Sequence, residues 1–312
     1  MSRLTVAICT YNRAERLPAL VAALRAQASP IPFEILFVNN NSTDNTAEVL
    51  GTLAAEPGPP LRAVVETQQG IVPARNRAVE ESLASDYLLV MDDDELPMPG
   101  WISAGLDALE REGADCAGGR VSVDFSPHGR PAWLSDELLG FLAEVDYGRE
   151  PFWIKDVSTP VWTANVAYRM SIFRNDAALR FDRRFNREGK AIGGGEDVAM
   201  FETLVARNAR IRYRPDMAVR HFVEPWRLRR RYFLKLHYRA GIRHALYGAD
   251  AYPRAPFGVP PFMFALLAKQ MWKTLLLYLK GDQAALRQAM NFTHEAGMIV
   301  GHALKWRREK KG

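Results

Sequence analysis

The chain has 312 residues, 48% of them hydrophobic and 25% charged, so it can bury a full core and is long enough for one large or two modest domains. Its two cysteines, Cys9 and Cys116, are too few for a disulfide framework and lack the paired spacing of a zinc site. A reducing, cytosolic compartment is therefore expected. The first residues contain neither the apolar region nor the cleavage site of a signal peptide, so export is not expected.

The net charge of +5 conceals an asymmetry between the two halves of the chain. Residues 1–156 contain 12 Lys and Arg against 24 Asp and Glu, whereas residues 157–312 contain 29 against 12. The basic second half predicts an anionic partner, such as phosphates, an acidic membrane surface or nucleic acid. The acidic first half predicts a requirement for cations.

The first hundred residues alternate short β-rich runs with helical patterns. Strands are expected at 4–10, 33–39, 61–67 and 87–91, and helices over 15–27, after 40–46 and over 73–84. This alternation predicts a mostly parallel sheet with helices on both faces. Further along, strands are expected at 114–125 and 161–170, and a loop entering a helix at 193–208.

Polar residues follow each of the first four predicted strands. The strands end in "CTYNR", "NNNSTDNT", "ETQQGIVPARN" and "DDDE". Because ligands of such sheets bind at the carboxyl ends of the strands, these four segments are expected to share one site. Clustered carboxylates at a strand end suit Mg²⁺ or Mn²⁺, and the alternative for "DDDE" is a solvated acidic turn.

Three other features admit both a functional and a structural interpretation. "GGGEDVAM" presents Glu196 and Asp197 at a helix start, where acids also act as simple caps, although capping does not explain the three glycines. His221 ends another predicted strand and is either a metal or phosphate ligand or a structural histidine. Arg75 and Asn76, in "PARN", suit a phosphate or sugar hydroxyls, and the alternative is a surface arginine.

From about residue 222 the composition is basic, aromatic and helical. The segment 261–281, "PFMFALLAKQMWKTLLLYLKG", is interrupted by Lys269 and Lys273, so it is expected to fall short of the roughly 20 apolar residues that cross a bilayer. Apolar residues flanked by cations predict a helix lying in the plane of an anionic membrane surface. The alternative is a buried helical hairpin.

Eight segments together resemble the family 2 glycosyltransferases of the GT-A fold. They are "VAICTYNRAERL", "ILFVNNNSTDNT", "GIVPARNRAV", "YLLVMDDDELPMPGW", "TANVAYR", "FDRRF", "GGGEDVAMF" and "IRYRPDMAVRH". The chain looks most similar to the bacterial exopolysaccharide branch of the succinoglycan type. The resemblance implies an α/β GT-A catalytic domain over residues 1–222. The composition of residues 223–312 predicts a basic amphipathic helical region that associates with membranes.

The resemblance also implies roles for individual residues. It implies a nucleotide base and ribose pocket lined by Thr10, Tyr11 and Asn39, although the family often has Asp at the position of Asn39. Around the diphosphate and sugar it implies contacts from Arg75, Asp92, Asp93, Asn165 and Glu196. A Mg²⁺ or Mn²⁺ ion would be held by Asp94, with His221 approaching the metal or diphosphate. Asp197 would be the base that takes the acceptor proton.

The activity so implied is an inverting, metal-dependent transfer of a sugar from a nucleotide-diphospho-sugar to an acceptor hydroxyl, on a saccharide or a lipid-linked intermediate. We expect the protein at the inner face of the plasma membrane, with no nucleic-acid partner. Dinucleotide and P-loop fingerprints are absent, as is the QxxRW motif of processive synthases. The alternative is a non-catalytic, basic membrane- or nucleic-acid-binding protein that has retained the fold.

Overall fold

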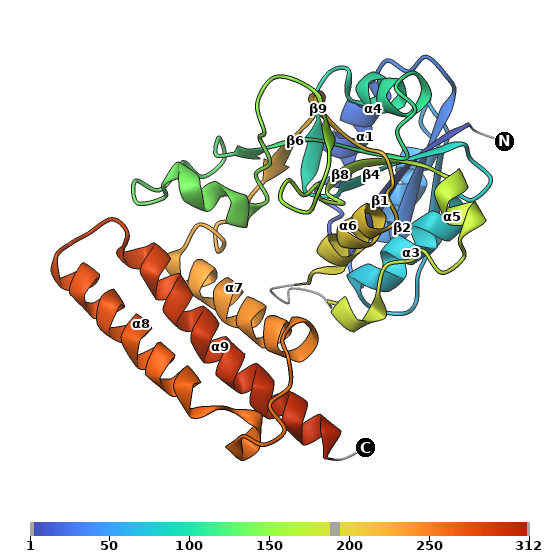
Figure 1. Ribbon diagram of the computed structural model, residues 1–312. Coiled ribbons are helices and arrows are strands. Elements are labelled where there is room, and N and C mark those ends of the chain that lie inside the picture. Colours follow the sequence, from blue (N-terminus) through green and yellow to red (C-terminus); the bar gives the residue numbers. More distant parts are fainter. Residues whose placement is uncertain (1–2, 188–193, 311–312) are drawn as a thin grey trace. The chain divides into compact units, whose positions relative to one another are not determined.

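The computed structural model describes residues 3–187 and 194–310, which form two compact units (Figure 1). The first unit comprises Met1–Pro127 and Asp136–Val223 and is an α/β domain. The second comprises His128–Ser135 and Glu224–Gly312 and is helical.

The described part of the α/β unit is built on a sheet of nine strands in the order β3-β2-β1-β4-β8-β6-β9-β5, with β7 added beside β9. The strands are β1 (Leu4–Thr10), β2 (Phe33–Asn39), β3 (Leu61–Val65), β4 (Tyr87–Asp92), β5 (Glu95–Pro97), β6 (Cys116–Asp124), β7 (Phe152–Ile154), β8 (Asn165–Arg169) and β9 (Ile211–Phe222). The first four strands lie where they were predicted, except that β3 ends two residues earlier and β4 one residue later. The α/β architecture expected of the GT-A fold is confirmed. The sheet is mixed rather than mostly parallel as expected, because the pairs β4–β8, β6–β8, β5–β9 and β7–β9 are antiparallel.

The parallel half of the sheet lies inside the core. All seven residues of β1 are buried, because β1 sits between β2 and β4 and has no free edge. A strand covered on both faces reads as a continuous apolar run, as "LTVAICT" does, rather than as an alternation. The parallel register pairs Thr10 with Asn39 and Cys9 with Asp92. The polar residues that end these strands therefore share one edge of the sheet.

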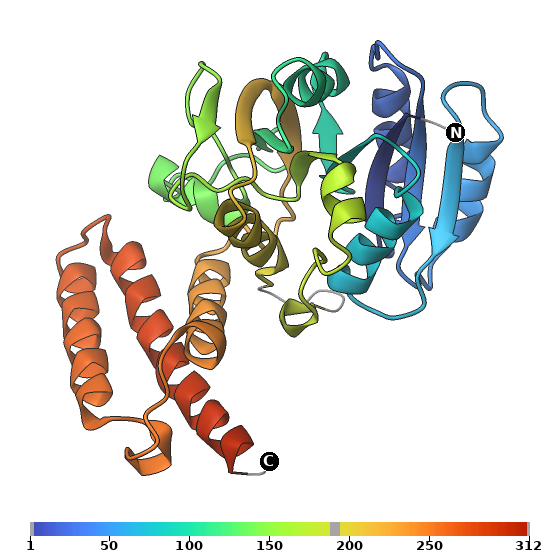
Figure 2. The ribbon, with the colours of Figure 1, turned by 45° about the vertical axis from the view of Figure 1, so that its right-hand side comes forward.

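Helices surround this sheet (Figures 1 and 2). They are α1 (Leu17–Arg25), α2 (Thr46–Ala54), α3 (Ile71–Glu81), α4 (Trp101–Glu110), α5 (Ser171–Asn175) and α6 (Glu196–Ala206), with 3₁₀ turns η1 (Asp136–Leu142) and η2 (Arg183–Phe185). The predicted loop into a helix at 193–208 is found as α6, although Gly193 lies outside the described residues.

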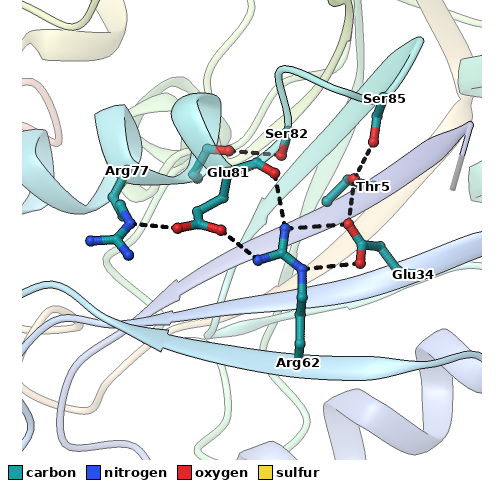
Figure 3. A network of polar contacts seen from close by, with 8 residues as sticks. Thr5, Glu34, Arg62, Arg77, Glu81, Ser82 and Ser85 are labelled. Atoms are coloured by element: carbon teal, nitrogen blue, oxygen red, sulfur yellow. Dashed lines mark hydrogen bonds and ion pairs between the residues drawn. The ribbon is translucent and has the colours of Figure 1, made fainter. Parts of the chain in front are cut away.

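A polar network joins the opposite, amino-terminal ends of the strands (Figure 3). Arg62 of β3 donates to Glu34 of β2 at 3.0 Å and to Glu81 at the end of α3 at 2.6 Å. Glu34 also accepts a bond from Thr5 of β1, and Glu81 accepts one from Arg77. The network ties three strands and one helix together far from the polar strand ends.

The helical unit contains α7 (Arg230–Arg243), a π-helical turn η3 (His244–Gly248), a 3₁₀ turn η4 (Pro256–Gly258), α8 (Pro261–Leu279) and α9 (Ala285–Glu309). Glycines allow α7 and α9 to pack closely. A Cβ on Gly241 would come 2.1 Å from the carbonyl oxygen of His294, and one on Gly297 would come 2.1 Å from that of Tyr238. The segment 128–135 joins this unit through Trp133, whose ring packs edge-on against Phe233.

Helix α8 is longer and more continuously apolar than expected. It has 19 residues and a mean hydropathy of 1.2, so by length and composition it is long and apolar enough to cross a membrane in spite of Lys269 and Lys273. It is also not the buried hairpin of the alternative interpretation, because only 6% of its apolar window is buried. The lysines fall on one side of the helix, so they interrupt the sequence without interrupting the apolar face.

Candidate active site

The loops that follow β1 and β2 are fastened to each other at the polar edge of the sheet. The side-chain oxygen of Asn12, which has a φ of 53°, accepts bonds from the backbone of Thr43 at 2.7 Å and Asp44 at 3.3 Å. Asn39 is buried, and its side-chain oxygen accepts the amide N–H of Ser42 at 3.0 Å. Asn39 thus shapes the loop beside the predicted base pocket. Tyr11 lies half-buried at the end of β1.

The buried side chain of Asn40 fastens the loop that follows β3. Its amide nitrogen donates to the carbonyl oxygen of Gln68 at 2.8 Å, and its oxygen accepts the N–H of Gly70 at 2.7 Å. Gly70 has a φ of 131° and precedes α3, and a Cβ there would collide with Asn186. This connection sets the start of α3 and hence the position of Arg75 one turn later.

The acidic run that follows β4 is largely shielded from solvent. The side chains of Asp93 and Asp94 are 14% and 16% exposed, and Glu95 is buried, so the solvated-turn interpretation is wrong. Asp93 accepts a bond from the Thr10 hydroxyl at 2.7 Å and lies 3.8 Å from the Arg13 guanidinium. Burial and the neighbouring Asp94 raise the pKa of Asp93 to about 7. A cation bound here would favour the charged carboxylates.

Asp94, the residue before β5, lies close to His221 of β9. His221 Nε2 lies 3.6 Å from an Asp94 carboxylate oxygen, and His221 Nδ1 lies 2.9 Å from the carbonyl oxygen of Leu142. An Nδ1–H donated to that carbonyl leaves the Nε2 lone pair on the side of Asp94. Helix η1, which carries Leu142, therefore orients the imidazole.

A carboxylate oxygen and an imidazole nitrogen are donors that Mn²⁺ accepts, and Mg²⁺ also accepts the carboxylate. Within residues 3–187 and 194–310, no group of three or more His, Cys, Asp or Glu side chains is arranged to hold a metal. The donors present therefore fit a metal held by one or two side chains together with substrate phosphates, which is how Mg²⁺ is commonly bound. They do not fit an all-protein metal site.

Arg75 connects the acidic run to the start of α6. The residue is 4% exposed, so it is not the surface arginine of the alternative interpretation. Its Nη1 donates to Glu196 at 2.6 Å and its Nη2 donates to Asp92 at 3.2 Å. Burial opposes the charge on Arg75, but Glu196, Asp92 and Asp197 outweigh it and raise the pKa of the guanidinium. Arg75 was expected to contact the diphosphate, but both of its terminal nitrogens bind carboxylates in this structure.

The glycines before α6 make room for Glu196. Gly195 has a φ of 115°, which only glycine adopts readily, and its N–H donates to Glu196 Oε2 at 2.9 Å. A Cβ on Gly194 would lie 2.6 Å from that same carboxylate oxygen. The glycines thus allow the chain to fold around Glu196, the buried partner of Arg75, and the ion pair gives Glu196 a role beyond the simple capping of the alternative interpretation.

Asp197 is half-buried at the start of α6, next to this ion pair. Its carboxylate accepts the backbone N–H of Val198 at 2.8 Å. Desolvation and the adjacent Glu196 raise the pKa of Asp197, and Arg75 only partly offsets them. Asp197 is therefore a stronger base than an ordinary exposed aspartate.

Asn165 was expected to contact the donor and is instead placed in the core. It is 1% exposed, accepts a bond from Trp101 Nε1 at 2.7 Å and donates to the carbonyl oxygens of Met217 at 2.7 Å and Arg120 at 3.0 Å. Its backbone pairs with Met91, the residue before Asp92. From the neighbouring strand β8, Asn165 thus supports β4, which leads into the acidic run.

Sequence reasoning missed the role of Glu95. In the sequence Glu95 was only one member of the acidic run "DDDE", but it is 2% exposed and lies opposite His221 in the β5–β9 pairing. One of its oxygens accepts the N–H of Asp92, and the other is buried without a hydrogen-bond partner among the described residues. Burial and the charges of Asp92 and Asp94 raise the pKa of Glu95. The strand β5 has only three residues, so the sequence shows no period that would have indicated this burial.

The arrangement of strand ends, acids and a buried arginine can be compared with known proteins. Residues 5–176 match the model of the family described as glycosyl transferase family 2. The chain belongs to this family. It is therefore a glycosyltransferase, and the interpretation as a non-catalytic binding protein is not supported.

Two relatives of this glycosyltransferase illustrate the extent of the similarity. It is 26% identical over 246 residues to the succinoglycan biosynthesis protein ExoM of Rhizobium meliloti, which covers 77% of this chain and 73% of ExoM. It is 30% identical over 135 residues to glycosyltransferase AglE of Haloferax volcanii, which covers 43% of this chain and only 44% of AglE. The resemblance to exopolysaccharide transferases is thus confirmed at the level of sequence.

Solved structures show the same fold at low identity. The family 2 chain superposes on the mannosyltransferase PcManGT of Pyrobaculum calidifontis, determined with GDP-Man and Mn²⁺, with a TM-score of 0.59 and 17% identity over 99% of this chain and 88% of that one. It superposes on residues 1–349 of S. aureus TarS, determined with UDP, with a TM-score of 0.55 and 14% identity over 99% and 92%. At these identities the comparison shows the fold alone.

Proposed function

We propose that the protein transfers a sugar from a nucleotide-diphospho-sugar to an acceptor hydroxyl, with inversion at the anomeric carbon and with a bound divalent metal. The observation that carries the proposal is the bridge formed by Arg75. By pairing with Asp92 and with Glu196, it joins the acidic run after β4 to the helix start that bears Asp197. Donor-side acids and a candidate base thus belong to one site.

The donor would lie along the carboxyl ends of β1, β2 and β4. Thr10, Tyr11 and Asn39 border the expected nucleoside pocket, and Asp92 and Asp93 border the expected ribose and sugar positions. The GDP-Man, UDP and UDP-GlcNAc seen in the structural neighbours support a nucleotide-sugar as donor. Because Asn39 is neutral and its oxygen is engaged with Ser42, uracil is not favoured over guanine or thymine by this residue.

Asp94 and His221 would hold Mg²⁺ or Mn²⁺ together with the donor phosphates. When bound, the metal supplies positive charge that stabilises the leaving diphosphate. Mn²⁺ in the structure of PcManGT supports the use of a divalent metal. In the protein itself, Leu142 orients the His221 ring, and buried Glu95 holds the backbone of Asp92.

Asp197 would accept the proton of the acceptor hydroxyl as its oxygen attacks the anomeric carbon. The new C–O bond forms on the face opposite the departing diphosphate, so the configuration inverts and no covalent enzyme intermediate is needed. A raised pKa suits a carboxylate to this role, because a stronger base accepts a proton more readily. Arg75 would fix Glu196 and, through it, the position of Asp197.

A saccharide or lipid-linked intermediate of cell-surface polysaccharide synthesis is the proposed acceptor, at the cytoplasmic face of an anionic membrane. The similarity to ExoM, named for succinoglycan biosynthesis, supports this class. So does the weaker similarity to an undecaprenyl-phosphate sugar transferase of Serratia proteamaculans. The cationic second half of the chain suits both the membrane and a phosphorylated lipid.

A screen of nucleotide sugars tests the proposal. UDP-, GDP- and dTDP-sugars would be incubated with the protein and Mn²⁺ or Mg²⁺, and release of the nucleoside diphosphate would be measured with and without chelator. We expect at least one donor to be turned over only in the presence of metal. Turnover that is equal with and without chelator would contradict metal dependence, and a retained anomeric configuration in a captured product would contradict inversion.

A further inference from the structure

The exposed apolar surface of the protein is concentrated on one helix. Among the described residues, eight of the eighteen large hydrophobic side chains that are exposed belong to α8: Phe262, Phe264, Met271, Trp272, Leu275, Leu276, Tyr278 and Leu279. Leu279 is 75% exposed and Trp272 60%. A contiguous apolar patch of this kind marks an interaction surface rather than an ordinary solvent-facing helix.

One side of α8 is already occupied within the helical unit. The less exposed positions are 263, 266, 267, 270, 274 and 277, which lie on one side of the helix. This side faces α9, where Gln288 donates to Gln270 at 2.6 Å. Figure 2 shows α8 and α9 running side by side along their length. With about 100° per residue, Trp272 and Leu279 point away from that contact, at the centre of the apolar face.

The charges on α8 lie at one border of this face. Lys269 and Lys273 are one turn apart and lie between the apolar face and the α9 contact, and Lys280 follows the helix end. No acidic residue occurs between Asp250 and Asp282. A broad apolar face with cations at its edge is complementary to a bilayer with anionic headgroups, because the lysine stems can follow the apolar surface while their ammonium groups reach phosphates.

A helix that spans the bilayer would have the same length and composition as α8, but the neighbouring helix α9 argues against a spanning placement. Helix α9 runs along α8 and carries Arg287, Glu295 and Lys305, besides His294 and His302. If α8 crossed the hydrocarbon, these ionisable groups would be carried into it at considerable cost. A helix in the plane of the surface leaves α9 in water.

We propose that α8 is a monotopic anchor that lies in the plane of an anionic phospholipid bilayer, with Trp272 and Leu279 entering the acyl boundary and Lys269 and Lys273 contacting headgroup phosphates. The proposal specifies which part of the chain contacts the anionic membrane named in the proposed function. It can be tested apart from the transfer reaction, because none of the residues proposed for donor binding or catalysis lies on α8. Failure of the anchor and failure of the enzyme assignment can therefore be told apart.

The first test measures the partition of the full chain to vesicles by flotation. Vesicles of phosphatidylcholine alone and of phosphatidylcholine with phosphatidylglycerol would be compared for the wild type, for Trp272→Glu with Leu279→Glu, and for Lys269→Gln with Lys273→Gln. The matched control is Val65→Glu with Val157→Glu, which places two acids at positions that are each 54% exposed but in the α/β unit. Circular dichroism and metal-dependent donor turnover confirm that each variant is folded.

We expect the wild type to bind the anionic vesicles and the Trp272 and Leu279 variant to lose about tenfold or more in partition, with the control unchanged. The lysine variant should lose the preference for phosphatidylglycerol. Equal partition of the wild type and the acidic α8 variant would overturn the proposal. So would a wild type that ignores vesicles but forms a dimer that the same variant dissociates, since a second copy would then cover α8.

The second test measures depth. Trp272 lies two residues from the middle of α8, about 3 Å along the axis, so in a spanning helix it would sit near the bilayer centre. The fluorescence difference between the wild type and Trp272→Phe would be quenched by lipids brominated either near the headgroup or deep in the chain. Stronger shallow quenching is expected, and stronger deep quenching would show a spanning helix and overturn the in-plane placement.

Discussion

Arg75 and Glu196, 121 positions apart in the chain, form an ion pair of 2.6 Å in which the two side chains are only 4% and 5% exposed. Arg75 reaches Asp92 with its other terminal nitrogen. A charge buried this deeply is retained at a cost in desolvation, and a hydrophobic pair would often be as stable. We therefore infer that the pair is kept because it positions other residues. It holds the start of α6, and with it Asp197, close to the acids that follow β4.

Removing one member of this pair should be more damaging than replacing both. Arg75→Met leaves Glu196 buried without its partner, so we expect a loss of about 3–5 kcal/mol in the free energy of unfolding. The double variant Arg75→Met with Glu196→Leu should recover most of that loss in urea denaturation but remain inactive, because nothing then positions Asp197. An active double variant would show that the pair has only a structural purpose.

The assignment of Asp197 as the base predicts a variant that binds but does not transfer. Asp197→Asn should lower kcat by a factor of about 10² to 10⁴, because the acceptor proton loses its acceptor, while the Kd for the nucleoside diphosphate is unchanged. The matched control is Glu202→Gln, an exposed acid on the same helix. Transfer by Asp197→Asn at the rate of the Glu202 variant would rule out the assignment.

Asn165 offers a test between a donor contact and a core support. Asn165→Ala would leave the indole N–H of Trp101 and two backbone carbonyls buried without partners, so we expect a loss of about 1–3 kcal/mol in the free energy of unfolding for each unpaired group. The fraction that remains folded at low temperature should keep a KM for donor within a few-fold of the wild type. A large rise in the KM for donor with unchanged stability would instead indicate that Asn165 contacts the donor.

The network at the amino-terminal ends of the strands predicts a pH dependence of stability. Burial raises the pKa of Glu81, but hydrogen bonds from Arg62 and Arg77 outweigh it and hold the pKa below its usual value of 4.5. A carboxyl with a depressed pKa in the folded state stabilises the protein above its unfolded pKa and loses that contribution as pH falls through the folded pKa.

Arg62→Met should therefore be less stable than the wild type by about 1–2 kcal/mol at pH 7, because Arg62 is partly exposed and solvent screens the pair. The difference should shrink as the pH falls below about 4.5. Donor turnover should be unaffected, since the network lies at the other end of the strands. Urea denaturation at pH 7 and pH 3.5 gives both values, and a difference that grows toward low pH would contradict the account.

The parallel half of the fold was predictable because its strands are local apolar runs that alternate with amphipathic helices. "LTVAICT" and "FEILFVN" match β1 and β2 residue for residue. The polar strand ends were predictable for the same reason, since parallel strands place their carboxyl ends together.

The contacts of the site were less predictable, because they depend on packing between distant segments. Nothing near Arg75 in the sequence indicates that Glu196 neutralises it. In the sequence Asn165 cannot be told from a ligand-binding residue, because its hydrogen bond with Trp101 becomes visible only in the folded structure. Glu95 was misread because its burial follows from a three-residue strand, β5, that is too short to show a period. The motifs indicated a candidate site, and the tertiary structure distinguished side chains at the polar strand ends from those, such as Asn165, that lie in the core.

The most direct test is a calorimetric titration of UDP, GDP and dTDP into the protein with Mn²⁺ and with chelator, for the wild type, for Asp94→Asn and for the control Asp86→Asn, an exposed acid at the opposite end of β4. We predict that the wild type and Asp86→Asn bind at least one of the three only with Mn²⁺, and that Asp94→Asn loses that binding by about tenfold or more. Binding by Asp94→Asn equal to that of the wild type, or no binding of any of the three by the wild type, would contradict a metal-assisted donor site at the end of β4.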